Sequence, residues 1–149
     1  MATLTATAST GQSTYPAQNV HVGTNTIYGQ YVTSASLSVG DVLYLARVPS
    51  GARVVDAWLD FGSVPSNVGT ICADLGDSSS DTTYLDSATL ADGTSRVLAR
   101  ATQGMGTRYL GTSTTSAFAI KATITEAGTT TNTMTVKWAI TYKCDENPA

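Results

Sequence analysis

Residues that could carry catalysis are few in this sequence, and they are not grouped. His21 is the only histidine, and the first forty residues around it contain no Asp, Glu, Lys or Arg. A Ser-His-Asp or Cys-His centre needs a base with a pKa near 7 and a third group that orients it. Nothing near His21 in the sequence offers that group. The pattern favours a surface or interface histidine, and it predicts a protein that is not an enzyme.

The segment DLGDSSSDTTYLD concentrates acidic residues, with Asp74, Asp77, Asp81 and Asp86. Asp-rich loops can supply the roughly six to eight oxygen ligands of calcium, so a bound cation is one interpretation. The spacing does not match an EF-hand loop, and Asp, Ser and Gly are also the residues that tight turns use. Turn chemistry is the favoured interpretation. A glycosidase is disfavoured, because the two glutamates lie near polar ends of segments.

Motifs for cofactors and metals are missing from the sequence. Cys72 and Cys144 are far apart and fit no metal-binding spacing, so two free, buried thiols are favoured over a disulfide. Gly104-Met105-Gly106 lacks the Lys-Ser/Thr pair that a phosphate-binding loop requires. We therefore expect no cofactor and no resident metal ion.

The composition points away from nucleic acid and membranes. The 149 residues carry a formal net charge of −3, and only 13% of them are charged. The eight basic residues are scattered between Arg47 and Lys143, whereas nucleic-acid binding requires clustered Lys and Arg. No stretch approaches the roughly 18 apolar residues of a membrane span, and no secretory signal is visible. We expect a soluble protein made in a cytoplasm, with no direct contact to nucleic acid or membrane.

The candidate functional side chains must be positioned by short β-strands, which are the elements that the sequence predicts. Threonine, which is β-branched and suits a half-exposed pleated surface, replaces many charged residues. One or two strands are predicted between His21 and Val39, where residues 27–33 are aromatic and β-branched, and further strands are predicted at 42–48, 53–61, 70–75, 82–85, 118–125 and 134–143. The last two alternate apolar and polar residues around the loop EAGTTTN, which predicts a β-hairpin with one buried face. Residues 86–104 fit either a single helical turn around Arg96–Ala101 or a long loop.

Roughly seven or eight strands with turn signals between them predict an all-β protein, an antiparallel β-sandwich or jelly-roll-like single domain. Gly40-Asp41 and Pro49-Ser50-Gly51 are two of the predicted turns. Residues 1–20 are neutral and rich in Thr, Ala, Ser and Gly, and they are predicted to form an extended N-terminal arm. Residues 21–149 form the predicted sandwich domain. Such an arm is most easily held by another subunit, where it can add to a sheet edge.

One predicted strand raises a question about its outer face. Its alternate residues are Val55, Ala57, Leu59 and Phe61 on one side, and Asp56, Trp58 and Asp60 on the other. If the first side is the core, a tryptophan lies outside between two acids. Tryptophan is enriched among interface anchors, so we hypothesise that Trp58 packs against a neighbouring subunit with the two acids at the rim. The alternative is that the chain's own arm or second sheet covers this face. Further interface candidates are Tyr15, Tyr28 and Tyr31, although core or loop positions also suit them.

The strand series GDVLYLARVPSGARVVDAWLDFGSV, GTICADLGDSSSDTTYLDSATLA and AFAIKATITEAGTTTNTMTVKWAITYK resembles the small structural proteins of tailed bacteriophages. The common features are an apolar strand ending in a Pro-x-Gly corner, a Gly-Asp…Tyr-Leu segment, and a long closing hairpin that ends in an aromatic residue, here Tyr142. The resemblance covers about residues 40–142. It implies a non-enzymatic virion protein with a β-sandwich or jelly-roll fold, and many such proteins act as head decoration or cement on the major capsid lattice.

The resemblance also implies the major capsid protein as partner, the virion capsid as location, and assembly in the host cytoplasm. A small homo-oligomer is expected, and a trimer would suit the threefold positions of an icosahedral lattice. Two alternatives stay open. One is a neck, tail or fibre component. The other is a carbohydrate-binding β-sandwich module, in which Trp58 with Asp56 and Asp60 forms an aromatic platform flanked by polar groups.

Overall fold

Every regular element in the described part of the chain is a β-strand. The computed structural model describes residues 3–5, 23–33, 37–49, 52–61, 69–92, 98–102, 118–128 and 134–144. The strands are β1 (Thr3–Thr5), β2 (Gly23–Val32), β3 (Val42–Val48), β4 (Arg53–Phe61), β5 (Thr70–Gly76), β6 (Leu85–Asp92), β7 (Leu98–Arg100), β8 (Phe118–Glu126) and β9 (Thr135–Cys144). The predicted all-β class is therefore confirmed.

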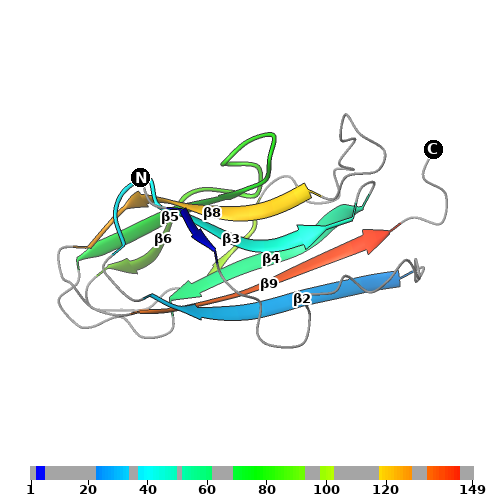
Figure 1. The fold of residues 1–149 in the computed structure, drawn as a ribbon, viewed down its shortest axis with the longest axis horizontal. Coiled ribbons are helices and arrows are strands. Elements are labelled where there is room, and N and C mark those ends of the chain that lie inside the picture. Colours follow the sequence, from blue (N-terminus) through cyan, green and yellow to red (C-terminus); the bar gives the residue numbers. More distant parts are fainter. Residues whose placement is uncertain are drawn as a thin grey trace.

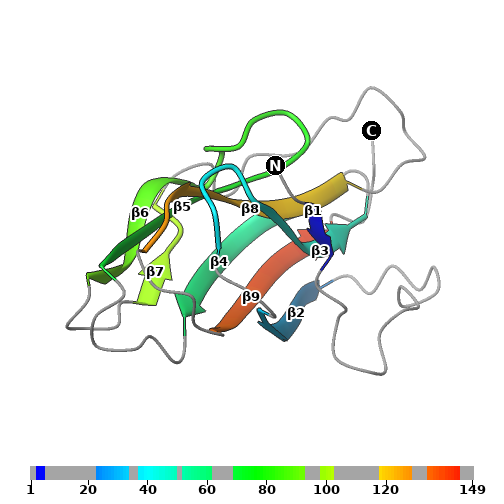
Figure 2. The ribbon, with the colours of Figure 1, turned by 60° about the vertical axis from the view of Figure 1, so that its left-hand side comes forward.

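The strands form two sheets that are layered as a sandwich (Figures 1 and 2). Sheet A has the strand order β1-β3-β8-β5-β6, and sheet B has the order β2-β9-β4-β7. Neighbouring strands are antiparallel, apart from β1, which pairs parallel to β3 at the edge of sheet A. Figure 2 shows β4, β9 and β2 side by side in one layer, with β5, β8 and β3 in the layer above. The predicted antiparallel β-sandwich is confirmed.

The predicted hairpin of the last two strands is wrong. Strand β8 lies in sheet A between β3 and β5, whereas β9 lies in sheet B between β2 and β4. Both strands alternate as predicted, because each turns one face to the core between the sheets. A polar loop between two strands can turn back within one sheet or cross to the facing sheet. The strands that it joins show the same apolar–polar alternation in both cases. Strands β3 and β4 also lie in different sheets, and the turn between them is closed by the Ala52 N–H, which donates to the Pro49 carbonyl at 3.2 Å.

Within residues 86–104, the described residues 86–92 and 98–100 lie in strands where the sequence predicted a helical turn or a loop. Strand β6 pairs with β5, and β7 pairs with β4, so both predictions for this segment are wrong. The β5–β6 ladder shifts register twice, and Ser87 has a φ of 45°. These irregularities break the period-two alternation that marks a strand in the sequence. Strand β7 has only three residues, too few to show an alternation.

One hydrophobic core fills the space between the sheets. The prediction for β4 holds for Ala57, Leu59 and Phe61, which are all fully buried, but it is wrong for Val55. Val54 points into the core instead and is 1% exposed. The ladder between β4 and β9 shifts register between Val54 and Asp56, which places an extra residue in β4 and changes the alternation at that point.

Trp138 of β9 is the largest fully buried side chain in the described core. Gly29 of β2 lies directly opposite it, so both residues face the same side of sheet B. A Cβ atom at Gly29 would lie 2.5 Å from Cζ2 of Trp138. The missing side chain at position 29 therefore provides the space in which the indole ring packs.

The Gly40-Asp41 turn is confirmed at the entry to β3. Gly40 has a φ of 89°, a conformation that residues with a side chain rarely adopt. The Ser38 N–H donates to Oδ2 of Asp41 at 2.9 Å, and the Asp41 N–H donates to the Ser38 carbonyl at 3.0 Å. The turn is joined to sheet A, because the N–H of Ile124 in β8 donates to the Asp41 carbonyl at 2.9 Å.

Only Thr3–Thr5 of the predicted N-terminal arm belong to the described residues. They form β1, in which Thr3 pairs with Val42 and Thr5 pairs with Tyr44. This segment adds a strand to the edge of a sheet, the mode of attachment predicted for the arm, here on its own chain. Tyr15 and His21 lie outside the described residues. Within those residues, no helix has the length and apolarity needed to cross a membrane.

Candidate partner-binding face

The register of sheet B brings Trp58 and Tyr28 onto one row of its outer face. Trp58 on β4 lies opposite Ala139 on β9, and Ala139 in turn lies opposite Tyr28 on β2. On the other side, Trp58 lies opposite Arg100 on β7. Directly opposed residues point to the same face of a sheet, and the residues that flank Trp58 and Ala139 along their strands point into the core. We call Arg100, Trp58, Ala139 and Tyr28 the aromatic row.

The aromatic row exposes apolar surface. Tyr28 is 72% exposed, and Trp58 is partly exposed. Ala139, with only a methyl group, lies buried between the two rings. Val32, also on the outer face of β2, is 56% exposed. Aromatic side chains on an exposed strand face offer large contact areas at low conformational cost, which suits them to anchor a partner.

Asp56 and Arg100 form a two-pronged ion pair beside Trp58. Nε of Arg100 donates to Oδ1 of Asp56 at 3.0 Å, and Nη2 donates to Oδ2 at 2.6 Å. The hydrogen bonds that Arg100 donates to Asp56, together with the negative charge of that carboxylate, raise the pKa of Arg100 further above its ordinary value. The pair is exposed to solvent and so contributes little to stability. Its effect is geometric, since it links β4 to β7 through Arg100, the residue directly opposite Trp58.

The remaining candidates predicted with Trp58 lie in different environments. Asp60 is on the outer face, two residues from Trp58, but it is 3% exposed and so presents almost no surface. Tyr31 is on the inner face of β2 and packs against the core. The structure therefore brings Trp58, Asp56 and Tyr28 together on one accessible surface and separates Tyr31 from them.

Polar side chains surround the aromatic row. The hydroxyls of Thr26 and Thr141 are 3.0 Å apart, and Thr141 lies opposite Asp56 in the next row of the sheet. Lys137 and Lys143 are exposed on the outer face of β9.

The sequence did not identify Arg100 as a member of this surface, because β7 was not predicted. The outward positions of Tyr28 and Lys137 follow from the period-two pattern, but only the register shows which of these residues are neighbours.

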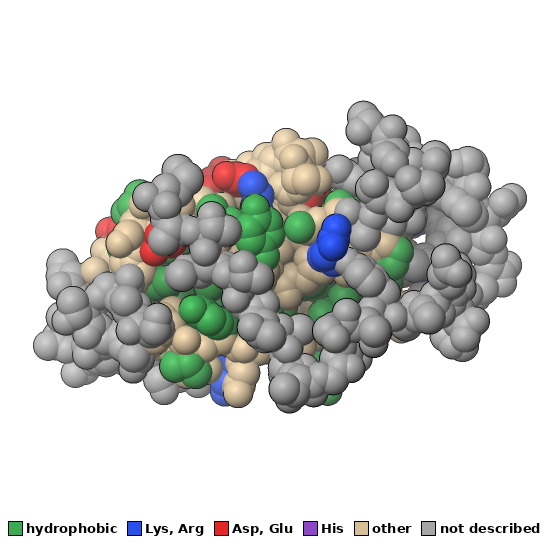
Figure 3. All heavy atoms as spheres, viewed as in Figure 1, with side chains coloured by type: hydrophobic (Ala, Val, Ile, Leu, Met, Phe, Trp, Pro, Cys, Tyr) green, Lys and Arg blue, Asp and Glu red, His purple; other side chains and the backbone are tan. Residues whose placement is uncertain are grey.

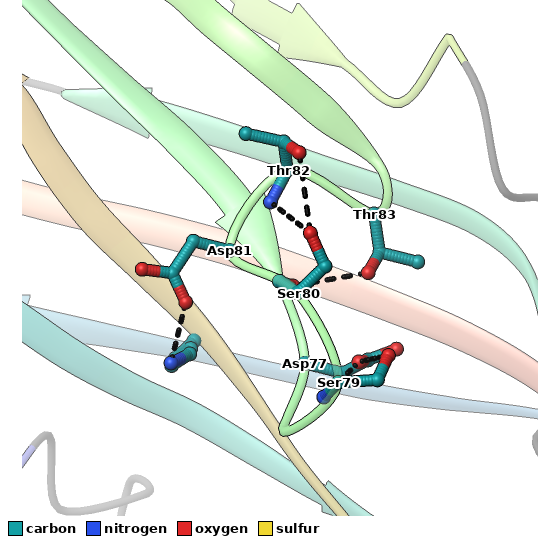
Figure 4. A network of polar contacts seen from close by, with 7 residues as sticks. Asp77, Ser79, Ser80, Asp81, Thr82 and Thr83 are labelled. Atoms are coloured by element: carbon teal, nitrogen blue, oxygen red, sulfur yellow. Dashed lines mark hydrogen bonds and ion pairs between the residues drawn. The ribbon is translucent and has the colours of Figure 1, made fainter.

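The acidic segment is a turn stabilised by its own carboxylates, as the turn interpretation predicted (Figure 4). Asp77 is 2% exposed, and its Oδ1 accepts hydrogen bonds from the N–H and the hydroxyl of Ser79. The Tyr84 hydroxyl donates to Oδ2 of Asp77 at 3.1 Å. At the tip of the turn, Asp81 forms a 2.6 Å ion pair with Lys121 of β8.

The other buried carboxylate of this region also serves the backbone. Oδ1 of Asp74 accepts a hydrogen bond of 2.7 Å from the N–H of Ser87, the residue with positive φ in β6. Within the described ranges, no group of three or more His, Cys, Asp or Glu side chains is placed to hold a metal ion. The described geometry of this segment is thus that of a turn.

Cys72 is a free thiol, as predicted, on the outer side of β5. Its Sγ donates to Oε2 of Glu126 at 3.6 Å and lies 3.7 Å from Oγ1 of Thr89. Burial raises the pKa of the Cys72 thiol, the hydrogen bond with Thr89 lowers it by less, and the hydrogen bond and negative charge of Glu126 raise it further. A thiol that is harder to ionise is a poor nucleophile, so these contacts indicate a structural role. The side chain of Cys144 lies outside the described residues.

Comparison with known proteins shows what this fold resembles. No family model and no curated protein matches the chain. It is similar to a chain of the cyanophage Pam1 capsid asymmetric unit, with a TM-score of 0.70 and 22% identity over 94% of this chain and 99% of that chain. A chain of the Ralstonia phage GP4 capsid gives a TM-score of 0.71 and 15% identity, over 98% of this chain and 100% of that one.

A third similar chain comes from the acid-stable capsid of the Helicobacter pylori bacteriophage KHP30. It gives a TM-score of 0.50 and 20% identity, over 81% of this chain and 93% of that chain. At these identities the similarity is one of fold. The protein therefore has the fold of whole chains that are found in phage capsids.

Proposed function

We propose that this protein is a structural component of a bacteriophage virion and is located in the capsid. The observation that carries the proposal is the end-to-end similarity of fold, with TM-scores of 0.70 and 0.71 to chains of the Pam1 and GP4 capsids. The alignments cover 99% and 100% of those chains. The similarity is therefore to a whole small protein and not to one domain of a much larger one.

The strand order supports this assignment. Strands β2–β9 divide into two sets of four, β2-β9-β4-β7 in sheet B and β3-β8-β5-β6 in sheet A. We interpret this arrangement as a jelly roll, in which the chain crosses repeatedly between two facing sheets. Jelly rolls are recurrent in viral capsid and lectin domains.

Within the capsid, we assign the protein a decoration or cement role, in which it binds and stabilises the lattice of the major capsid protein. The aromatic row supports this role, because it offers anchors for a partner on a rigid sheet. Many weak contacts of this kind, repeated by the symmetry of a shell, give strong attachment. Assembly in the host cytoplasm, self-association and a held N-terminal arm belong to the same proposal.

A non-enzymatic function fits the described chemistry. The buried carboxylate of Asp77 accepts hydrogen bonds from its own turn, that of Asp74 accepts one from the N–H of Ser87 in β6, and Cys72 has a raised pKa. None of these three groups has the features of an activated acid, base or nucleophile.

Carbohydrate binding is the second candidate function, and the aromatic row favours it specifically. Trp58 and Tyr28 flank the small Ala139, with the Asp56–Arg100 pair and the Thr26 and Thr141 hydroxyls nearby. Sugars stack on aromatic rings and bond to such polar groups, and lectin domains share the jelly-roll architecture.

The experiment that tests the proposal compares phage particles with and without this protein. Deletion of the coding sequence should yield capsids that lose DNA or rupture at a lower temperature, and the purified protein should rebind them and restore stability. Particles of unchanged stability, or protein found only at the neck, tail or fibres, would contradict the cement role. Saturable binding of the purified protein to glycans, without binding to capsids, would support the second candidate.

A further inference from the structure

Three of the four sheet edges in the described part of the chain are short or irregular. Strand β1 at one edge of sheet A and strand β7 at one edge of sheet B have three residues each. Strand β6, at the other edge of sheet A, shifts register twice against β5 and contains Ser87 with its φ of 45°. Short edge strands and bulges are two of the means by which proteins prevent a sheet from pairing with further strands.

The fourth edge, strand β2, has none of these protections. It is ten residues long and pairs with β9 over its whole length without a register shift. Its sequence GTNTIYGQYV contains no proline and no charged residue. Among the described strands only β9 lies beside it, and the acidic side chains visible in Figure 3 lie in the upper half of the molecule, away from β2 (Figures 1 and 3). Strand β2 is therefore the edge that is built to accept another strand.

The backbone groups of β2 that point away from β9 follow from the end of the ladder. The Thr33 N–H donates to the Met134 carbonyl at 2.8 Å, which is the bond of a hydrogen-bonded pair. In an antiparallel ladder such pairs alternate with non-hydrogen-bonded pairs, whose N–H and C=O groups point to the opposite side. Because the ladder is regular, the outward groups belong to every second residue of the strand, and the side chains of these residues are exposed as well: Thr24, Thr26, Tyr28, Gln30 and Val32.

These five residues are arranged symmetrically about Tyr28. A second β2, placed antiparallel beside the first with a two-fold axis at Tyr28, brings this tyrosine opposite its own copy. The same register brings Thr26 opposite Gln30, and Thr24 opposite Val32. Each hydrogen-bonded pair exchanges two bonds, so the contact contains about ten backbone hydrogen bonds, the number found in a typical protein interface. The neutral strand suits this arrangement, because a charge near the axis would be repelled by its own copy.

We propose that two copies of this protein pair edge to edge through β2 and form a two-fold dimer. The two B sheets become one continuous sheet, with the axis perpendicular to it, so both aromatic rows lie on the same surface and meet at Tyr28. The outer face of sheet B stays free for the capsid lattice, and one dimer presents the aromatic row twice, which strengthens attachment. The inference rests on the proposed function, in which copies self-associate, and it names the edge through which they meet.

Two double variants of the full-length protein test the pairing and its register. Thr26→Lys with Gln30→Lys places like charges opposite each other across the two-fold axis, whereas Thr26→Lys with Gln30→Glu places opposite charges there. Both variants lose the contact between the Thr26 and Thr141 hydroxyls, so they are matched in that respect. Sedimentation equilibrium should show a dimer for the wild-type protein and for the Lys-Glu variant, and at least about tenfold weaker association for the Lys-Lys variant. Circular dichroism melting should show that both variants are folded.

Equal association of the two variants, whether strong or weak, would overturn the proposal, and so would a wild-type protein that is a monomer or a trimer. If a monomeric wild-type protein bound capsids and the Lys-Lys variant did not, β2 would accept a strand of another protein, which also contradicts self-pairing. Capsid binding is measured separately from self-association. A dimer that does not bind capsids would therefore contradict the proposed function and leave the dimer in place.

Discussion

Gly29 and Trp138 lie opposite each other in the β2–β9 ladder, and a Cβ atom at position 29 would lie 2.5 Å from Cζ2 of the indole ring. Because Gly29 has no side chain, β2 can pack closely over the indole ring of Trp138. Trp138 is 1% exposed, whereas the outward residues of the same strand pair include Tyr28 at 72%. The position of the exposed aromatic row therefore depends on a glycine that makes room for a buried aromatic residue.

Substitution of Gly29 by Ala should destabilise the protein by about 1–3 kcal/mol, because the added methyl group overpacks the site of the indole ring. This cost should exceed the gain of about 0.5–1 kcal/mol that Ala has over Gly in an unstrained strand. Urea unfolding followed by tryptophan fluorescence measures the change. Gln30→Ala, an exposed neighbour, is the control and should change stability by less than about 0.5 kcal/mol. Equal stability of the two variants would contradict the packing described for Trp138.

Asp77 should be more important for stability than Asp81, although both lie in the same turn. Asp77→Ala removes the acceptor of the buried Tyr84 hydroxyl and of the two Ser79 donors, and we expect a loss of about 1–3 kcal/mol. Asp81→Ala removes only an ion pair whose acid is 48% exposed, and we expect a loss of about 0–1 kcal/mol. Chemical denaturation of both variants tests the difference. If calcium raised the melting temperature of the wild-type protein but not of the Asp77 variant, the cation interpretation would replace that of a turn.

The raised pKa of Cys72 predicts a loss of stability in alkaline solution. The folded protein favours the protonated thiol, so this contribution is fully present below the ordinary pKa of 9.0 and is lost as the pH rises through the higher pKa of the folded state. The difference in unfolding free energy between the wild-type protein and Cys72→Ala should be constant near neutral pH and change in favour of the variant in alkaline buffer. A parallel pH dependence of the two proteins would contradict the burial of this thiol.

The aromatic row should affect binding more than folding. Tyr28→Ala should leave the free energy of unfolding within about 0.5 kcal/mol of the wild type, because the side chain is 72% exposed. Trp58→Ala should cost more, since Trp58 is partly buried, yet the domain should stay folded. Both variants should bind depleted capsids at least about tenfold more weakly if these residues are interface anchors. Phe61→Ala, a core change, is the contrasting case and should destabilise the domain by about 3–5 kcal/mol.

The sequence predicted the strands better than it predicted their partners. Alternation in β3, β4, β8 and β9 was sufficient to locate them, because one side of each strand faces the same core. The same alternation arises whether consecutive strands pair or cross to the facing sheet, so the β8–β9 hairpin was predicted wrongly. The bulge at Val54 and Asp56 could not be foreseen either, since an extra residue in one strand is determined by its pairing with the next.

The aromatic row could be predicted only in part, because its members come from strands that are distant in sequence. The acids beside Trp58 marked it as an outward residue, and the structure places it there. Its neighbours Arg100 and Tyr28 are 42 and 30 residues away in sequence, and only the order and register of sheet B bring them together. Long-range pairing of this kind is determined by tertiary packing and not by local sequence.

The central claim is that this protein lies in a phage capsid, and its most direct test is a cryo-electron microscopy map of particles from the source that encodes this chain. The account predicts density for the sandwich on the capsid lattice, in many symmetric copies, with the outer face of sheet B covered by a neighbouring subunit. Clear density for the lattice with no sandwich bound to it, in particles that contain the protein by mass spectrometry, would contradict the capsid assignment and would direct attention to the tail or to glycan binding.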